Sequence, residues 1–142
     1  MTDILRVRGE VFGKELGMPE AAAESPDDLL SVHAVALNEN DEVVAVGTLG
    51  FDGARFEISK IAVLKDYRGQ YYGDFIVKLL IDKAALGGAK EIYGLTVEGT
   101  EGFMKTVRFE TAGEAYEAEG KKIIPMKISE ENLANRSCGG CH

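Results

Sequence analysis

The chain has 142 residues, enough for one domain with a sizeable buried core. Its content of 45% hydrophobic and 28% charged residues is typical of a globular protein and argues against a disordered chain. The formal net charge of −8 argues against a nucleic-acid binder and against attachment to an anionic membrane, and it favours cationic partners such as amines.

The first predicted element is a helix over 4–16, where apolar side chains recur near helical spacing and Gly17 followed by Pro19 indicates the stop. Charges in every turn of this segment exclude a signal-peptide core, and no apolar run reaches the 18 or so residues of a membrane span. We therefore expect a cytoplasmic protein. Residues 18–28 either continue as a short helical turn or form an irregular loop.

Three strands are predicted next, over 31–38, 43–51 and 56–64, because alternating β-rich runs are separated by turn clusters. They form an antiparallel meander. A helix follows over 73–86, and we expect four of its residues on one buried face: Ile76, Leu79, Leu80 and Ala84.

The last third of the chain predicts a buried strand over 90–97, a short helix over 99–109 and two strands within 112–128. Pro125 must lie at an edge or at a strand start, because proline cannot donate to a strand ladder. This order of elements indicates an α/β or α+β sheet with helices on both faces.

The stretch "KDYRGQYYG", residues 65–73, joins the third strand to the helix. First-turn N–H groups have no intrahelical acceptor and the helix dipole adds partial positive charge, so a helix preceded by such a loop can bind an anion. Lys65 and Arg68 make this loop basic within an acidic chain, which favours a phosphate-bearing ligand. The alternative is a plain surface turn. No Walker loop or dinucleotide fingerprint is present, because the glycine spacing differs.

The segment from Ile58 to Val97 resembles the core of the GNAT acetyltransferase superfamily, in which a strand is followed by R/Q-x-x-G-x-G/A, a long helix and a strand. Arg68, Gly69, Gln70 and Gly73 carry the match. "GFMKTVRF" is similar to the family's F-Y-x-x-x-G-F helix, and "VRGEVFGKELGMPE" to the opening of a subgroup of small bacterial members. The likeness spans about residues 6–128.

The resemblance implies a mixed, mostly antiparallel central sheet flanked by helices, and acetyl transfer from acetyl-CoA to a small-molecule or peptidyl amine. It implies that the third strand pairs with the pantetheine arm and that the loop and helix N-terminus bind the CoA pyrophosphate. The cofactor-binding residues expected by this likeness are Ile61, Ala62, Val63, Arg68, Gly69, Gln70, Tyr71, Tyr72, Gly73 and Asp74.

The sequence departs from the family in side chains that carry chemistry. Tyr71 stands at the inner glycine, where a glycine lets the backbone approach the pyrophosphate. Met104 stands where many members have the tyrosine that protonates the departing thiolate, and methionine has no proton to donate. Arg108 replaces the glycine before Phe109. Substitutes for the missing acid are Tyr72, Tyr93 and Tyr116, although strand tyrosines more often serve packing.

The candidate catalytic base is Glu57, which shares a face of the third strand with Ser59 and Ile61 by period two. Its alternative role is a solvated carboxylate on the strand. His33 is better explained as a core or edge histidine. In the family a strand precedes the first helix, whereas this chain starts almost at that helix, so we expect the sheet to lack that strand or its edge to be covered by another chain or segment.

The C-terminal "SCGGCH" has the form of a haem attachment site, but haem attachment needs export, which nothing here suggests. Cys138, Cys141 and His142 are candidate ligands for zinc or iron, or the cysteines form a reversible dithiol, or the tail is disordered.

The sequence thus predicts an acetyl-CoA N-acetyltransferase domain over 1–128 and a tail over 129–142. The alternative is a CoA-binding or regulatory module without turnover, with a metal or redox role for the tail. We expect a monomer or a homodimer, since an exposed sheet edge makes pairing feasible.

Overall fold

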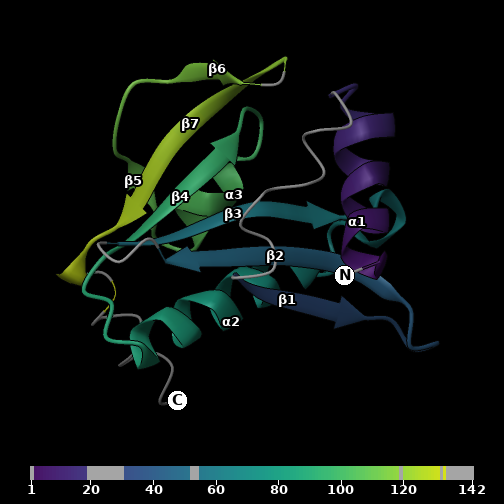
Figure 1. Ribbon diagram of the computed structural model, residues 1–142, viewed down its shortest axis with the longest axis horizontal. Coiled ribbons are helices and arrows are strands. Elements are labelled where there is room, and N and C mark those ends of the chain that lie inside the picture. The colour runs from purple at the N-terminus through teal and green to yellow at the C-terminus, as the bar shows by residue number, and fades with distance from the viewer. Residues whose placement is uncertain (1, 19–30, 52–54, 119, 132, 134–142) are drawn as a thin grey trace.

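The computed structural model describes residues 2–18, 31–51, 55–118, 120–131 and 133 (Figure 1). It contains a twisted mixed sheet with helices on both faces, as predicted. The strands are β1 (Val32–Leu37), β2 (Val43–Phe51), β3 (Phe56–Val63), β4 (Ile92–Val97), β5 (Glu110–Thr111), β6 (Tyr116–Ala118) and β7 (Lys121–Ile128). The helices are α1 (Thr2–Arg8), the π-helix η1 (Gly9–Glu15), the 3₁₀ turn η4 (Lys65–Tyr67), α2 (Tyr72–Leu86) and α3 (Glu101–Thr106).

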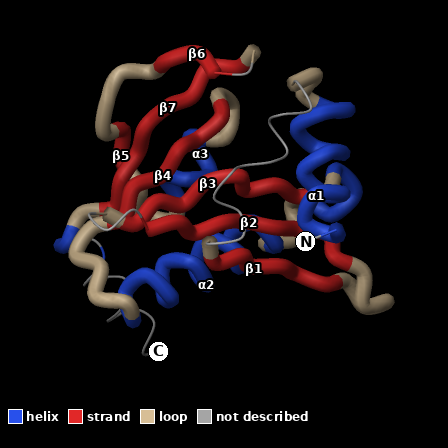
Figure 2. Tube along the Cα trace, viewed as in Figure 1, coloured by secondary structure: helices blue, strands red, loops and turns tan. Residues whose placement is uncertain are grey.

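The strand order across the sheet is β1-β2-β3-β4-β7-β5, with β6 also paired to β7. All neighbours are antiparallel except β3 and β4, which are parallel. The predicted meander of β1, β2 and β3 is confirmed. Since α2 connects the two parallel strands as a crossover, one half of the sheet is joined to the other through this helix (Figure 2).

Each face of the sheet has its own apolar core. On one face α2 and α3 pack against the sheet around Ile58, Ile76, Leu80 and Met126, which are all essentially inaccessible. On the other face α1 and η1 bury a smaller cluster: Ile4, Val7, Val11, Phe12, Met18, Val43, Val46 and Ala62. The first described element is α1, and no strand precedes it in the described part of the chain.

Two details of the elements differ from the predictions. The second half of the first helix is π-helical, with Leu16 N–H bonded to Val11 O at 3.0 Å instead of to the carbonyl four residues back. In α2, Leu79 is 40% exposed although Ile76, Leu80 and Ala84 are buried as expected. No helix among the described residues combines the length and apolar content of a membrane span.

Pro125 lies within β7, an interior strand, so the prediction of an edge or a strand start is wrong. Its own carbonyl accepts from Ala112 N–H at 2.9 Å, on the side of β7 away from β4. The N and C=O of one strand residue point the same way, so the missing N–H also faces that side. There β5 pairs with residues 126 and 127 and β6 with residues 121–123, which leaves Pro125 between the two short strands.

Candidate functional site

The parallel strands β3 and β4 separate after only three paired positions, the last of which joins Ile58 to Gly94. The cause lies in β3, where Lys60 has φ 53° and the register against β2 shifts between Val46 and Thr48. This is a β-bulge, which bends the bulged strand away from its regular course. From Ser59 onward β3 therefore has no pairing with β4, and the two strand ends diverge in Figure 1.

The backbone of the diverging β3 end offers hydrogen-bonding groups toward β4. Leu64 N–H bonds to Val44 O at 2.9 Å, so Leu64 and, by alternation, Ala62 face β2. Val63 and Ile61 consequently point their N–H and C=O groups to the side that β4 has left. The backbone groups of Ile61 and Val63 thus form the edge of β3 that β4 does not pair with.

The bulge also changes which side chains share a face of β3. Phe56 and Ile58 pack on the α2 side, so Glu57 and Ser59 lie on the opposite side. Beyond the bulge the Ile61 side chain is again on the α2 side, 2.6 Å from where a Cβ on Gly47 would be. The expectation that Ile61 shares a face with Glu57 is therefore wrong. Ala62 is also corrected: its side chain is buried under α1 and η1, and its backbone faces β2.

The N-terminus of α2 lies next to the diverging end of β3. Tyr71 is the N-cap residue, and its carbonyl accepts from Phe75 N–H at 3.0 Å. No side chain caps this helix in the described part of the chain. The first-turn N–H groups, those of Tyr72, Gly73 and Asp74, have no intrahelical acceptor, so they are available to an anion in the manner expected from the sequence.

Tyr71 occupies the family's inner glycine position without changing the backbone that a glycine would adopt. Its φ of 67° and ψ of 14° are left-handed, a conformation that costs a non-glycine residue about 1–2 kcal/mol. Its side chain is 81% exposed. The ring thus points into solvent and does not pack over the helix N-terminus.

Gly73 is closely packed at the start of α2. A Cβ there would lie 3.3 Å from Cζ of Phe103 in α3 and 3.5 Å from Cγ2 of Val63. The start of α2, the end of β3 and α3 therefore meet at this one residue. The neighbouring loop residues are open: no heavy atom would lie within 4 Å of a Cβ on Gly69, and Gln70 Nε2 donates to Asp66 O at 3.4 Å.

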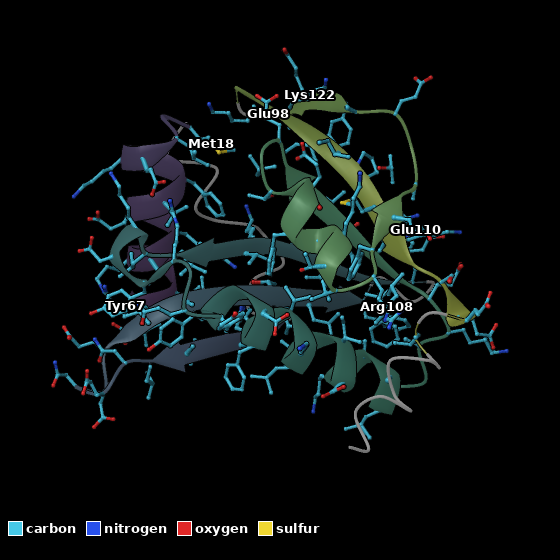
Figure 3. The ribbon with its side chains drawn as sticks, turned by 180° about the vertical axis from the view of Figure 1, so that it is seen from behind. Met18, Tyr67, Glu98, Arg108, Glu110 and Lys122 are labelled. Atoms are coloured by element: carbon cyan, nitrogen blue, oxygen red, sulfur yellow. The ribbon has the colours of Figure 1, made fainter. Side chains whose placement is uncertain are left out.

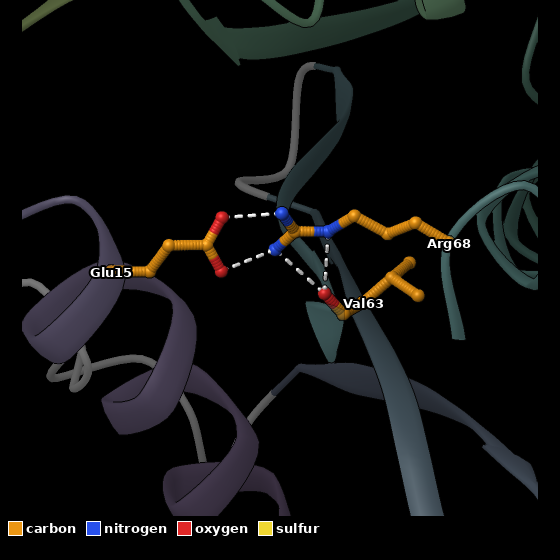
Figure 4. A network of polar contacts seen from close by, with 3 residues as sticks. All are labelled: Glu15, Val63 and Arg68. Carbon is orange, nitrogen blue, oxygen red and sulfur yellow. Dashed lines mark hydrogen bonds and ion pairs between the residues drawn. The ribbon is translucent and has the colours of Figure 1, made fainter. Parts of the chain in front are cut away.

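Arg68 is held by partners within the protein (Figure 4). Its Nε and Nη2 donate to Val63 O at 3.0 and 2.9 Å, and Nη2 donates to Glu15 Oε1 at 2.6 Å, while Nη1 pairs with Glu15 Oε2. The hydrogen bond from Arg68 lowers the pKa of the Glu15 carboxyl, and that carboxyl raises the pKa of Arg68. The guanidinium, expected from the sequence to add free positive charge to the loop, instead ties the loop to η1 and to β3.

Glu15 is the residue that sequence reasoning missed. It lies at the end of η1, 53 positions before Arg68, and it neutralises the arginine charge. Lys65, the other basic loop residue, lines a shallow pocket of about 220 Å³ between η1 and the loop, together with Glu10, Val11, Lys14, Glu15 and Leu64. In the sequence, the one signal for this ion pair is that Glu15 and Arg68 both lie in stretches that resemble the family, "VRGEVFGKELGMPE" and "KDYRGQYYG".

Met104 is buried against β4 and presents no proton donor. It is 3% exposed, and its methyl group lies 3.2 Å from where a Cβ on Gly94 would be. Arg108, after α3, has φ 73°, so it too has a left-handed backbone, which the glycine of the family pattern would adopt freely. Figure 3 shows Arg108 and Tyr67 toward opposite ends of the molecule. Tyr67 belongs to the loop before α2, so Arg108 lies far from that loop.

The tyrosines considered as substitutes for the missing acid lie in separate places. Tyr72 packs edge-on against Tyr67, with ring centroids 6.0 Å apart. Tyr93 lies on the face of β4 opposite α3 and donates to Glu91 Oε1 at 3.3 Å, while Tyr116 is 45% exposed on β6. Tyr93 and Tyr116 are not part of the apolar cluster that contains Met104, whereas Tyr72 packs against that cluster. His33 has a structural partner, with Nδ1 3.0 Å from Thr48 Oγ1.

Glu57 is half-buried at the last paired stretch of β3, opposite Tyr93 of β4 and on the side away from α2. The C-terminal residues Cys138, Cys141 and His142 lie outside the described residues, so their metal ligation stays a prediction. Among the residues that are described, no group of three or more His, Cys, Asp or Glu side chains could hold a metal.

Comparisons with known proteins identify the family and the fold. Residues 3–103 match the family model described as "Acetyltransferase (GNAT) family". The fold is similar to that of Escherichia coli ElaA (TM-score 0.79, 22% identity, covering 90% of this chain and 88% of that one). It is also similar to that of an acyl-CoA N-acyltransferase from Pseudomonas aeruginosa (TM-score 0.78, 19% identity, covering 90% of this chain and 89% of that one). A third similar structure is an aminoglycoside 6'-N-acetyltransferase complexed with coenzyme A (TM-score 0.71, 14% identity, covering 91% of this chain and 89% of that one). The family match covers more than half of the chain, and the chain therefore belongs to the GNAT acetyltransferase family.

Proposed function

We propose that the protein is an N-acetyltransferase that moves the acetyl group of acetyl-CoA to a primary amine by direct attack. The observation that carries the proposal is the separation of β3 from β4 beside the uncapped N-terminus of α2. One feature offers a strand edge to an amide-containing arm, and the other offers N–H donors to a diphosphate. Acetyl-CoA has both groups in one molecule.

In this proposal the pantetheine arm pairs with the backbone of Ile61 and Val63. The Val63 carbonyl already accepts from Arg68, so the N–H of Val63 and both groups of Ile61 remain for the arm. The pyrophosphate lies against the first-turn amides of α2 and the loop from Arg68 to Tyr71. Arg68 acts there as a positioning residue, because its guanidinium holds the loop through Glu15 and β3.

The amine would enter from the α1 side of the sheet, where Glu57 is the candidate base at the point of strand separation. The reaction needs the nitrogen to attack the thioester carbonyl, the C–S bond to break and the thiolate to leave. With Met104 at the tyrosine position, positioning and backbone donation to the thioester oxygen would supply much of the rate. The transferase domain spans residues 1–128.

The buried Met104 favours one alternative, a CoA-binding module without turnover. The two are separated by incubating the protein with acetyl-CoA and a panel of polyamines, aminoglycosides and lysine peptides, and measuring released free thiol. Amine-dependent thiol release with a matching acetylated product supports the transferase. CoA binding without release of free thiol on any amine supports the binding module. If Glu57→Gln leaves the rate of thiol release unchanged, Glu57 is not the catalytic base.

A further inference from the structure

Thr96 of β4 carries a buried hydroxyl that nothing in the described protein uses. The residue is 3% exposed, its Oγ1 is inaccessible, and no hydrogen-bond partner for it lies within the described ranges. Buried polar groups are paired in the large majority of cases, because an unsatisfied one loses its water without compensation. Such a group in a native structure needs an explanation, and a partner that binds from outside the chain is one.

The position of Thr96 indicates which ligand group that is. Gly94 and Thr96 lie on the same face of β4 by period two, and Gly94 contacts Met104 and Phe109 on the α3 side. Gly94 is also the last β4 residue paired with β3. Thr96 is thus the first side chain on the α3 face beyond the separation of the strands, about 7 Å along β4 from that point.

Met104 and Thr96 therefore lie on the same side of the diverging strands, and only Thr96 has a proton to donate. The substitution at 104 removes the hydroxyl that α3 would bring to Gly94, while the hydroxyl at 96 is provided by the neighbouring strand. Met104 and Thr96 are both 3% exposed, and a hydrogen bond made in such buried surroundings is stronger than one made in water.

We propose that the Thr96 hydroxyl, which protein atoms cover in the free structure, becomes accessible when CoA enters between β3 and β4, donates a hydrogen bond to the sulfur of CoA and stabilises the thiolate as it leaves. This rests on the proposed function. The amine nitrogen forms a bond to the acyl carbon, the C–S bond breaks, and its electron pair stays on sulfur. The excess proton of the nitrogen passes to a base or to water, and water later protonates the released thiolate. Thr96 keeps its own proton throughout, since an aliphatic alcohol is a far weaker acid than a thiol.

Thr96→Val tests the proposal, because valine has the same shape and lacks the hydroxyl, and Thr96→Ser is the matched control that retains it. The first readout is the pKa of the thiol of bound CoA, followed by the ultraviolet absorbance of the thiolate. It needs no turnover. We expect this pKa to be about one higher in the valine variant than in the wild type, and to be restored toward the wild-type value by serine.

The second and third readouts are thermal stability and turnover. Without ligand, Thr96→Val should raise Tm by about 3 °C, because an unsatisfied hydroxyl is removed from the interior. With acetyl-CoA and an accepted amine, kcat should fall about tenfold with little change in KM for acetyl-CoA. A residue with a purely structural role would not combine higher stability with lower turnover.

The outcomes separate this inference from the proposed function. Unchanged thiol pKa in the valine variant overturns the role of Thr96 even if the protein is an active transferase. Loss of CoA affinity with an unchanged thiol pKa also overturns it, since the hydroxyl would then bind the pantetheine amides. A pKa change without turnover on any amine supports Thr96 as a sulfur ligand and overturns acetyl transfer. Absence of CoA binding by the wild type overturns both.

Discussion

The loop before α2 and the helix α3 both depart from the family pattern, but the two departures differ in kind. In the loop, Tyr71 stands at a glycine position of the family pattern and has a left-handed backbone, which glycine adopts freely, with the ring exposed. Arg108 does the same after α3. At Met104 the resemblance implies that the replaced group is a proton-donating side chain, and a buried thioether has no proton to donate.

The comparison teaches that a function carried by backbone amides can tolerate a change of side chain at a small cost in strain, whereas a function carried by a side chain cannot. We therefore expect cofactor binding to be retained and the chemical step to be slower than in a family member with the tyrosine. The predictions below test the two halves of this statement.

The largest expected effect is on the chemical step. Met104→Tyr should raise kcat about 100-fold, because it restores a proton donor to the leaving group, measured as amine-dependent thiol release. Met104→Phe is the matched control, with the ring and without the hydroxyl, and it should not raise kcat. Equal rates for the two variants would mean that no acid is missing.

A smaller effect is expected for the ion pair that positions the loop. Arg68→Glu should weaken CoA binding about tenfold or more by titration calorimetry, because like charges would then separate η1 from the loop. Glu15→Gln keeps the arginine and a hydrogen-bond acceptor, and it should cost much less. If Glu15→Gln instead tightened CoA binding strongly, Arg68 would be a direct phosphate ligand whose charge Glu15 masks.

The backbone strain at Tyr71 predicts a stabilising substitution. Tyr71→Gly should raise the free energy of unfolding by about 1 kcal/mol at most, since glycine adopts positive φ freely but is also freer in the unfolded chain. Tyr71→Ala removes the ring and retains the strain, so denaturant unfolding should show no such gain. Arg108→Gly should match Tyr71→Gly in stability and leave CoA affinity unchanged. A loss of CoA affinity in Tyr71→Gly would mean that the ring contacts the cofactor.

The smallest effect is a pH dependence from Glu15. Its pKa is lowered in the folded protein from the usual 4.5 by the hydrogen bond from Arg68. The contribution of this carboxylate to stability is therefore complete above pH 4.5 and is lost as the pH falls through the lowered value. Acid unfolding should show a shallower stability loss in Glu15→Gln than in the wild type below pH 4.5, and no difference in slope near pH 7. Parallel curves would remove Glu15 from the acid response.

Local patterns predicted the element order and the loop well, because alternation in β1 to β3 and the helical spacing of α2 are local properties. The bulge at Lys60 was not predictable, since one positive φ shifts which side chains face α2 and leaves no mark on the residue types. The partner of Arg68 was missed because an ion pair across 53 residues depends on the tertiary arrangement. Pro125 was misplaced because a gap between β5 and β6 on the far side of β7 has no local signal.

Titration calorimetry of the wild-type protein with CoA tests the central claim most directly, since it asks whether the backbone at α2 still binds the cofactor with Tyr71 in the loop. We predict saturable binding with a Kd near the micromolar range, about −8 kcal/mol, and a clear loss of affinity for pantetheine without the diphosphate. No heat of binding at millimolar CoA, or equal affinity for pantetheine and CoA, would contradict the assignment of the loop as the diphosphate site.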